Sequence, residues 1–228
     1  MSEEWFKNKI PKSSTELYSE LYSGSVYLLP PSKASLELVS RATDFIKEVF
    51  EQEEIRNVHA KYSGDIFFEK VKILRKEIYL SEQYRELTIN LIDEIGFAND
   101  KIAFDPMRIR ALVDRGWENP KAVSAYYAHR DTWYAHSHSE INWWLPLHDV
   151  ETEDTFSFFP EYFNKEVPNN SEVFDYDQWT SGGDGLKIGW QNKNAGIENV
   201  YPGQTAEVPI TEIQTFSAKA GSRLVFAG

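Results

Sequence analysis

Residues 128–133 read Ala-His-Arg-Asp-Thr-Trp, and residues 141–147 read Ile-Asn-Trp-Trp-Leu-Pro-Leu. The first stretch overlaps an apolar run, 123–128, that is typical of a strand. Side chains two residues apart in a strand share a face, so His129 and Asp131 can both reach one cation. A neutral imidazole and a carboxylate are both ligands of divalent transition metals. The two stretches therefore predict β-structure built around a candidate metal site.

The His and Asp pair supplies two of the three ligands in the 2-His-1-carboxylate arrangement. That arrangement holds non-heme Fe(II) on one face and leaves the other face open. The missing His is expected on a late strand, but residues 220–228 read Ala-Gly-Ser-Arg-Leu-Val-Phe-Ala-Gly and contain none. The alternative interpretation is a surface pair, because so short a motif often occurs by chance.

Composition and charge limit the class of protein. Hydrophobic residues make up 41% of the 228 residues, which is enough to fill a sizeable core. The net charge of −12 disfavours nucleic acid and anionic membranes as partners, because both would be repelled. The absence of Cys excludes disulfides and thiolate zinc sites. With no secretory signal at the N-terminus, we expect a cytoplasmic protein.

The first hundred residues are expected to be mainly helical. Apolar residues between Leu38 and Phe50 recur at steps of three and four, which indicates an amphipathic helix, and Ser32 is placed to cap it. Further helices are expected after Asp65 and after Ser81. Gly96 is placed to end the last of these helices.

After residue 100 the pattern changes to short strands separated by turn residues. The strands are expected at 107–113, 123–128, 139–150, 156–160, 212–218 and 223–226. Helices followed by strands predict an α+β fold, in which an antiparallel β-sandwich or barrel has helices packed on one face. Because no Gly/Ser/Pro linker intervenes, we expect a single domain over residues 1–228, with a helical part at 1–100 and a β part at 101–228.

Three segments resemble a known family. Residues 129–133, 141–147 and 157–163 are similar to the core of the Fe(II)/2-oxoglutarate-dependent oxygenases, and most similar to the phytanoyl-CoA dioxygenase-like branch. In that family a double-stranded β-helix, or jelly roll, carries His-x-Asp at the end of an early strand, followed by a Trp- and Pro-bearing strand. A late Gly-containing turn, which residues 220–228 resemble, leads to the distal His. We therefore expect a jelly roll at 101–228 that is C-terminally incomplete, ending just before that His.

The resemblance implies roles for individual residues. His129 and Asp131 would be the catalytic metal ligands, with Fe(II) as the metal and 2-oxoglutarate as the co-substrate. Asn142 and Trp144 lie on the strand that lines the co-substrate pocket in the family. The distal His, and the basic residue that usually follows it and pairs with the distal carboxylate of 2-oxoglutarate, have no counterpart. Arg108 and Arg110 alternate on an earlier expected strand, and either could bind a carboxylate bidentately; the alternative is a pair of solvated strand charges.

The activity implied is hydroxylation of a small or medium organic substrate, with decarboxylation of 2-oxoglutarate to succinate. Asp131 favours hydroxylation over halogenation, because related halogenases have a small residue at that position. The alternative function is a non-catalytic jelly-roll ligand-binding protein or an inactive truncated relative. The pattern does not identify the substrate or the oligomeric state.

The remaining histidines offer two further possibilities. His136 and His138 form a His-x-His pair that could hold Zn or Cu, and the alternative is a pair of exposed turn residues. If the iron site is completed within the chain, the third ligand must be His59, His136, His138 or His148.

Overall fold

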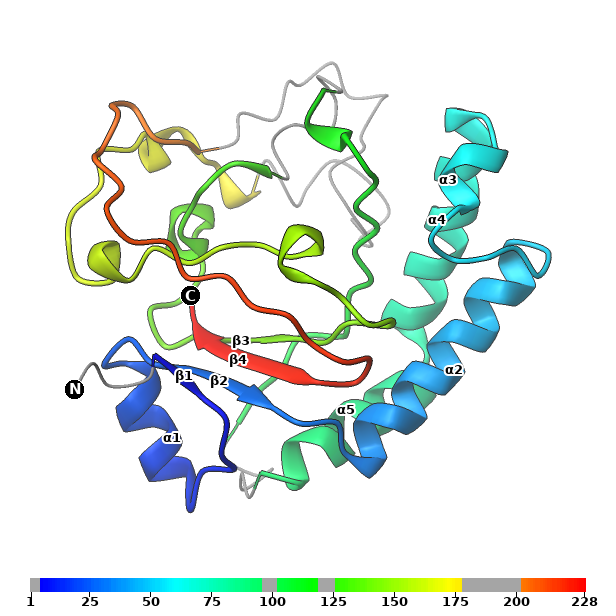
Figure 1. Cartoon of the computed structure of the whole chain (residues 1–228), viewed down its shortest axis with the longest axis horizontal. Coiled ribbons are helices and arrows are strands. Elements are labelled where there is room, and N and C mark those ends of the chain that lie inside the picture. Colours follow the sequence, from blue (N-terminus) through cyan, green and yellow to red (C-terminus); the bar gives the residue numbers. More distant parts are fainter. Residues whose placement is uncertain (1–4, 96–101, 119–125, 178–201) are drawn as a thin grey trace. The chain divides into compact units, whose positions relative to one another are not determined.

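The computed structural model describes residues 5–95, 102–118, 126–177 and 202–228 (Figure 1). The chain forms two compact units. The first contains residues 1–109, 141–158 and 214–227, and the second contains residues 110–140, 159–213 and 228. Within the described residues, the first unit holds all the α-helices and paired strands, whereas the second is built from short 3-10 turns and irregular backbone.

The first unit contains a four-stranded sheet in the order β1-β2-β4-β3. Its strands are β1 (Phe6–Lys7), β2 (Val26–Leu29), β3 (Ile141–Trp144) and β4 (Arg223–Ala227). Only β1 and β2 pair in parallel, and the other two pairings are antiparallel. The late strand β4 therefore lies between an early strand and a middle one.

Antiparallel pairing continues beyond β3 and β4. Trp144 pairs with Leu224, and the isolated bridge between Val150 and Ala218 keeps the same register. A further bridge joins Phe158 to Gln214 after a shift of four residues. Segments 141–158 and 214–227 thus run past each other over their whole lengths.

Gly221 forms the turn that leads into β4. Its φ is +79°, which favours glycine, and a Cβ there would lie 3.3 Å from side-chain atoms of Leu36 and Ser35. Both the backbone conformation and the close approach of α2 therefore require a residue without a side chain at this position.

Helices make up most of the rest of the first unit. They are α1 (Ser14–Leu21), α2 (Lys33–Val49), α3 (Val58–Lys61), α4 (Gly64–Leu80) and α5 (Glu82–Asp93). The buried residues of α2, α4 and α5 form a shared core, so these helices lie side by side in Figure 1. Among the helices that the structure describes, none combines the length and apolar character needed to cross a lipid bilayer.

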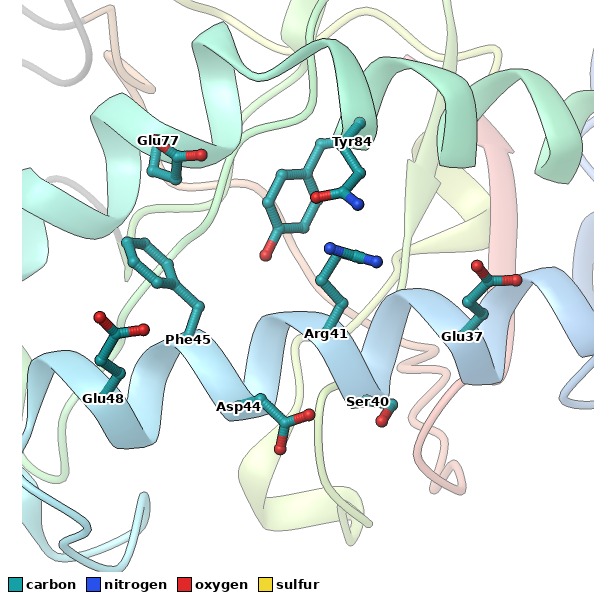
Figure 2. A pocket seen from close by; sticks show the side chains of 9 residues that line it. Glu37, Ser40, Arg41, Asp44, Phe45, Glu48, Glu77 and Tyr84 are labelled. Carbon is teal, nitrogen blue, oxygen red and sulfur yellow. The ribbon is translucent and has the colours of Figure 1, made fainter.

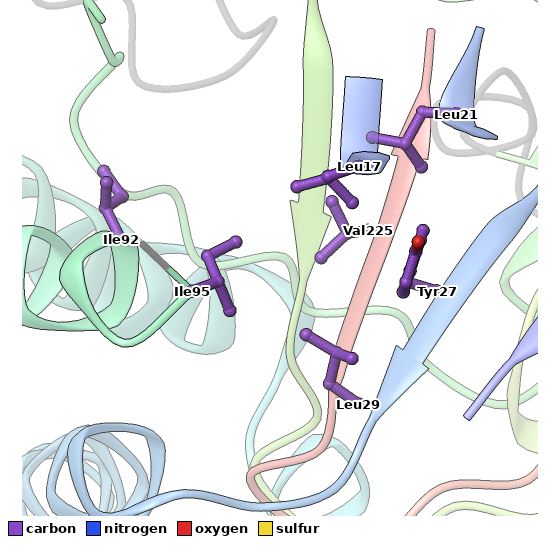
Figure 3. Packing of buried hydrophobic residues seen from close by; sticks show 7 residues of the cluster. All are labelled: Leu17, Leu21, Tyr27, Leu29, Ile92, Ile95 and Val225. Atoms are coloured by element: carbon purple, nitrogen blue, oxygen red, sulfur yellow. The ribbon is translucent and has the colours of Figure 1, made fainter. Parts of the chain in front are cut away.

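One face of the sheet is covered by helices. Leu17 and Leu21 of α1 pack with Tyr27 of β2 and Val225 of β4, and Ile92 of α5 joins the same cluster (Figure 3). The leucines and Val225 are fully buried, and each such side chain contributes about 1.5–3 kcal/mol to folding. This cluster fixes the central strands of the sheet against α1 and α5.

The other face of the sheet is covered by aromatic side chains. Because side chains alternate along a strand, Trp144 and Phe226 point away from the helices. They pack with aromatic rings from 156–158 and with Phe216, at centroid distances of 5.2–5.9 Å. This cluster also contains Phe6 of β1. The sheet is therefore buried on both faces within the first unit.

An ion pair between the buried Arg223 and the more exposed Glu94 ties α5 to β4. Arg223 is only 3% exposed, and its Nη1 lies 3.0 Å from Oε2 of Glu94. The other oxygen of Glu94 accepts a hydrogen bond from the backbone N–H of Ala34, in the first turn of α2. Glu94 therefore joins the start of one helix, the end of another and the central strand.

The prediction of a fold that combines helices with a mainly antiparallel sheet is confirmed. The three predicted helices are confirmed, and Ser32 caps α2 through a reciprocal pair of hydrogen bonds with Ser35. The strand at 223–226 is also confirmed, whereas the one at 139–150 is paired as a strand only over Ile141–Trp144. The predicted end at Gly96 and the first half of the strand at 123–128 lie outside the described residues, and the described half, 126–128, is not a strand.

Three other predicted strands are wrong. Residues 107–113 form no strand, because the partly buried Met107 and Ile109 pack against helix clusters instead of pairing with a sheet. Residues 156–160 and 212–218 meet at one bridge, between Phe158 and Gln214, and Ala218 forms a second bridge with Val150; neither segment forms a continuous strand. The alternation of apolar residues there reflects packing on the aromatic cluster, which needs no continuous ladder.

Candidate metal centre

His129 and Asp131 lie in the second unit, close together but not on a strand. Arg130 between them is extended, and Asp131 is the first residue of a 3-10 turn, Asp131–Tyr134. His129 Nε2 lies 3.4 Å from Oδ1 of Asp131. The side chains are 36% and 27% exposed, so a small ion can reach the space between them. The extended Arg130 gives the two side chains the same-side placement that a strand was expected to give.

The backbone selects the nitrogen that His129 presents to Asp131. Its Nδ1 lies 2.8 Å from the carbonyl oxygen of Tyr127, so this contact assigns the proton to Nδ1 as the donor. In the neutral imidazole, Nε2 then carries the lone pair. A hydrogen bond from one ring nitrogen to a backbone carbonyl is the usual way in which proteins orient a metal-binding His.

The facing atoms need a cation between them. The Nε2 lone pair and the carboxylate oxygen of Asp131 are both acceptors, and the space between them suits a proton or a metal ion. The Asp131 carboxylate accordingly raises the pKa of His129, while burial and the charge of Arg110 act in the opposite direction. A metal ion would take the place of the proton that this arrangement attracts.

Tyr134 supports the imidazole. Its ring meets His129 edge-on, with the centroids 5.3 Å apart and an interplanar angle of 89°. It also packs against Phe174 at 5.6 Å. Burial, followed by the charge of Asp131, raises the pKa of Tyr134. Sequence reasoning missed this residue, although its position three residues after Asp131 is one 3-10 turn away and could have indicated it.

Arg130 points to a different part of the second unit. Its guanidinium donates hydrogen bonds to the backbone carbonyls of Tyr162 and Lys165. Hydrogen bonds from a charged donor are stronger than neutral ones, so this side chain holds the segment after the turn Pro160–Tyr162. Sequence reasoning also missed this role, because no residue near Arg130 in the sequence indicates that its side chain binds carbonyls more than thirty residues away.

Arg110 lies within electrostatic range of the pair. Its charge acts on the pKa of both His129 and Tyr134, and its own side chain is exposed. It belongs to the same unit as His129 and Asp131. The structure therefore places near the pair one of the two arginines that were predicted to be able to bind a carboxylate.

Asn142 and Trp144 belong to the first unit. Both lie on β3, on the face that carries the aromatic cluster. The Trp144 ring packs edge-on against Phe156 and Phe216, each at 5.6 Å, so it has a packing role of its own. Their predicted part in binding the co-substrate stays a prediction.

The other histidines do not complete the site within the described residues. Nδ1 of His136 lies 2.5 Å from Oε2 of Glu140, so this imidazole pairs with a carboxylate. All five histidines belong to the part of the chain that the structure describes. In that part, no three His, Asp or Glu side chains gather in a way that could hold a metal ion.

Comparisons of the chain with models of protein families, with curated proteins and with solved structures give no match. The geometry of the His129–Asp131 pair, together with the sequence motifs, therefore carries the functional proposal.

Proposed function

We propose that this protein is a non-heme Fe(II)/2-oxoglutarate-dependent dioxygenase that hydroxylates a small or medium organic substrate. The observation that carries the proposal is the His129–Asp131 pair, with Nε2 and Oδ1 3.4 Å apart and Nδ1 bonded to a backbone carbonyl. A simple surface ion pair does not need the second contact. A metal-binding imidazole does, because the contact fixes the tautomer.

The distance between the two donor atoms fits one metal ion. Nitrogen and oxygen ligands lie about 2.1 Å from a first-row metal, so two neighbouring ligands are roughly 3.0–3.4 Å apart. The separation of His129 Nε2 and Asp131 Oδ1 lies at the upper end of that range. The two groups also match the imidazole and carboxylate of the facial arrangement that holds Fe(II).

Each residue of the site would have its own role. His129 and Asp131 would hold the iron, which when bound supplies the activation of O2 coupled to decarboxylation of 2-oxoglutarate. Tyr134 keeps the imidazole in place through its edge contact. Arg110 would bind a carboxylate of 2-oxoglutarate, because a guanidinium pairs bidentately with that group. The Asp131 carboxylate favours hydroxylation, since it fills the position where a halide would bind.

The jelly-roll architecture is the second part of the proposal. It is supported by the antiparallel course of segments 141–158 and 214–227, and by the glycine turn that precedes β4. The aromatic face of the sheet, which carries Asn142 and Trp144, would form the interior of the roll. The cysteine-free composition supports a cytoplasmic location.

The test is formation of succinate from 2-oxoglutarate by the purified chain with Fe(II), O2 and ascorbate. We expect His129→Ala and Asp131→Ala each to reduce the metal-dependent rate at least tenfold, since each removes a metal ligand. His148→Ala is the matched control, because this partly exposed His lies in the first unit, and it should keep the rate. A rate indistinguishable from that of free iron in every variant would instead favour a non-catalytic ligand-binding domain.

A further inference from the structure

A pocket of about 530 Å³ lies between α2 and the junction of α4 with α5 (Figure 2). Its wall on α2 is formed by residues on one side of the helix, among them Glu37, Arg41 and Phe45 at four-residue spacing. Glu77 of α4 and Tyr84 of α5 face them. All of these residues belong to the first unit, so the pocket is defined within one compact body.

Two buried polar groups in this pocket lack partners. Tyr84 is only 3% exposed, and among the described residues its hydroxyl has no hydrogen-bond partner. The buried Nε of Arg41 lacks a partner in the same part of the chain. In Figure 2 the guanidinium extends from α2 toward Tyr84, whose hydroxyl points back toward α2. Because buried donors are almost always paired, each of the two groups calls for an oxygen acceptor.

The charge of the pocket indicates which groups a ligand would carry besides an oxygen acceptor. Its lining contains four carboxylates and one guanidinium, which leaves three net negative charges. A purely anionic ligand such as phosphate or a dicarboxylate would be repelled. The ring of Phe45 also lines the pocket and offers a face that attracts cations. A ligand that suits these surroundings carries both a carboxylate and more than one positive group.

The electrostatic surroundings of Tyr84 agree with this arrangement. Burial raises the pKa of Tyr84, Arg41 acts to lower it and Glu77 acts to raise it. The hydroxyl therefore keeps its proton and can donate a hydrogen bond. One cation, Arg41, and one carboxylate, Glu77, lie within electrostatic range of this hydroxyl.

We propose that this pocket binds a free basic α-amino acid of the lysine class. Its carboxylate would accept hydrogen bonds from Arg41 and Tyr84, and its ammonium groups would face Glu37 and Glu77. A diamine lacks the acceptor that the two buried donors require, and it would place a cation against Arg41. The proposal is independent of the His129–Asp131 pair and holds whether or not the chain is an oxygenase.

Calorimetric titration of the full chain with three probes tests the proposal. L-lysine should bind saturably. 1,5-Diaminopentane, which is lysine without its carboxylate, and glutarate, which has no ammonium group, should both bind at least ten times more weakly. Failure of L-lysine to saturate by about 10 mM would overturn the proposal. Equal binding of the diamine would also overturn it, because it would show an acidic surface that attracts any cation.

Two variants locate the site. Tyr84→Phe removes only the hydroxyl and should weaken L-lysine binding about tenfold, since a hydrogen bond to a charged group is lost. Tyr79→Phe, the same change at a residue outside the pocket, should leave the affinity unchanged. Glu77→Gln at the exposed rim does not disturb the core and should weaken L-lysine binding as well. Unchanged affinity in both pocket variants would contradict this location.

Discussion

Different forces stabilise the interior of each of the two units. In the first, helices and a sheet bury large apolar clusters on both faces of the strands. In the second, the backbone is mostly irregular, and side chains bind backbone groups far along the chain, as Arg130 does at Tyr162 and Glu161 does at Thr211. The candidate metal ligands belong to the second kind of structure.

This difference shows how a reactive pair can be positioned without regular secondary structure. Hydrophobic burial is non-directional and stabilises a unit as a whole. Hydrogen bonds to carbonyls and amides are directional and fix individual side chains. His129 is oriented by one such bond, to Tyr127. Single substitutions can remove one kind of support and leave the other in place.

The largest effect is expected in the core of the first unit. Leu224→Ala removes a fully buried side chain of the central strand and should lower the free energy of unfolding by about 2–5 kcal/mol. Ile73→Ala, at a side chain that is 53% exposed, should change it by under about 0.5 kcal/mol. Denaturant unfolding measures both, and equal effects would show that β4 is not the centre of a buried core.

Arg130→Gln tests the polar support of the second unit. It removes a charged donor from the carbonyls of Tyr162 and Lys165, and we expect a loss of about 1–3 kcal/mol. Amide hydrogen exchange should become faster around residues 160–165, while exchange in α2 stays as in the unsubstituted chain. Faster amide exchange in α2, together with an unchanged exchange rate at residues 160–165, would contradict this role.

Features that depend on local signals could be predicted from the sequence, whereas features that depend on distant partners could not. The helix over Lys33–Val49 was predictable, because an apolar period and a capping Ser32 are local signals. The helix α1 was missed although Ser13 and Glu16 form a recognisable start, with the Ser13 side chain accepting from the Glu16 N–H. Strands at 107–113 and 156–160 were wrong, because pairing depends on a distant partner that no local pattern specifies.

The site itself was predictable only in part. The two-residue spacing indicated that His129 and Asp131 approach each other, and the structure brings them together. The contacts of Arg130 and the packing of Tyr134 on Phe174 were not predictable, because they depend on segments more than thirty residues away. The 3-10 turn that begins at Asp131 also has no capping hydrogen bond to indicate it.

The pH dependence of His129 gives a finer test of the pair. Its pKa is raised above the ordinary value, so the attraction to Asp131 contributes stability below the pKa of the unfolded chain. That contribution is lost as pH rises through the raised pKa of the folded state. Asp131→Asn should therefore destabilise the protein more at acidic than at alkaline pH.

The same variant can be followed by NMR titration of the imidazole. The pKa of His129 should fall in Asp131→Asn, because the main cause of its elevation is removed. The His138 resonance in the same spectra serves as the internal reference. A pKa of His129 that does not change would mean that the pair does not form in solution.

The smallest effect is expected at Ala135. This residue ends the turn that begins at Asp131 and has a φ of +60°, in the left-handed region that favours glycine. Ala135→Gly should raise the free energy of unfolding by under about 1 kcal/mol, the relief of strain being partly offset by greater freedom of the unfolded chain. A lower stability on denaturant unfolding would show that Ala135 does not adopt this conformation.

Anaerobic titration with Fe(II) in the presence of 2-oxoglutarate tests the central claim most directly. The readout is the weak metal-to-ligand charge-transfer band that appears in the visible when both bind at one site. We predict a band in the unsubstituted chain and in His148→Ala, and its loss in both His129→Ala and Asp131→Ala. No band in the unsubstituted chain, or a band that survives in His129→Ala, would contradict the assignment of this pair as the iron ligands.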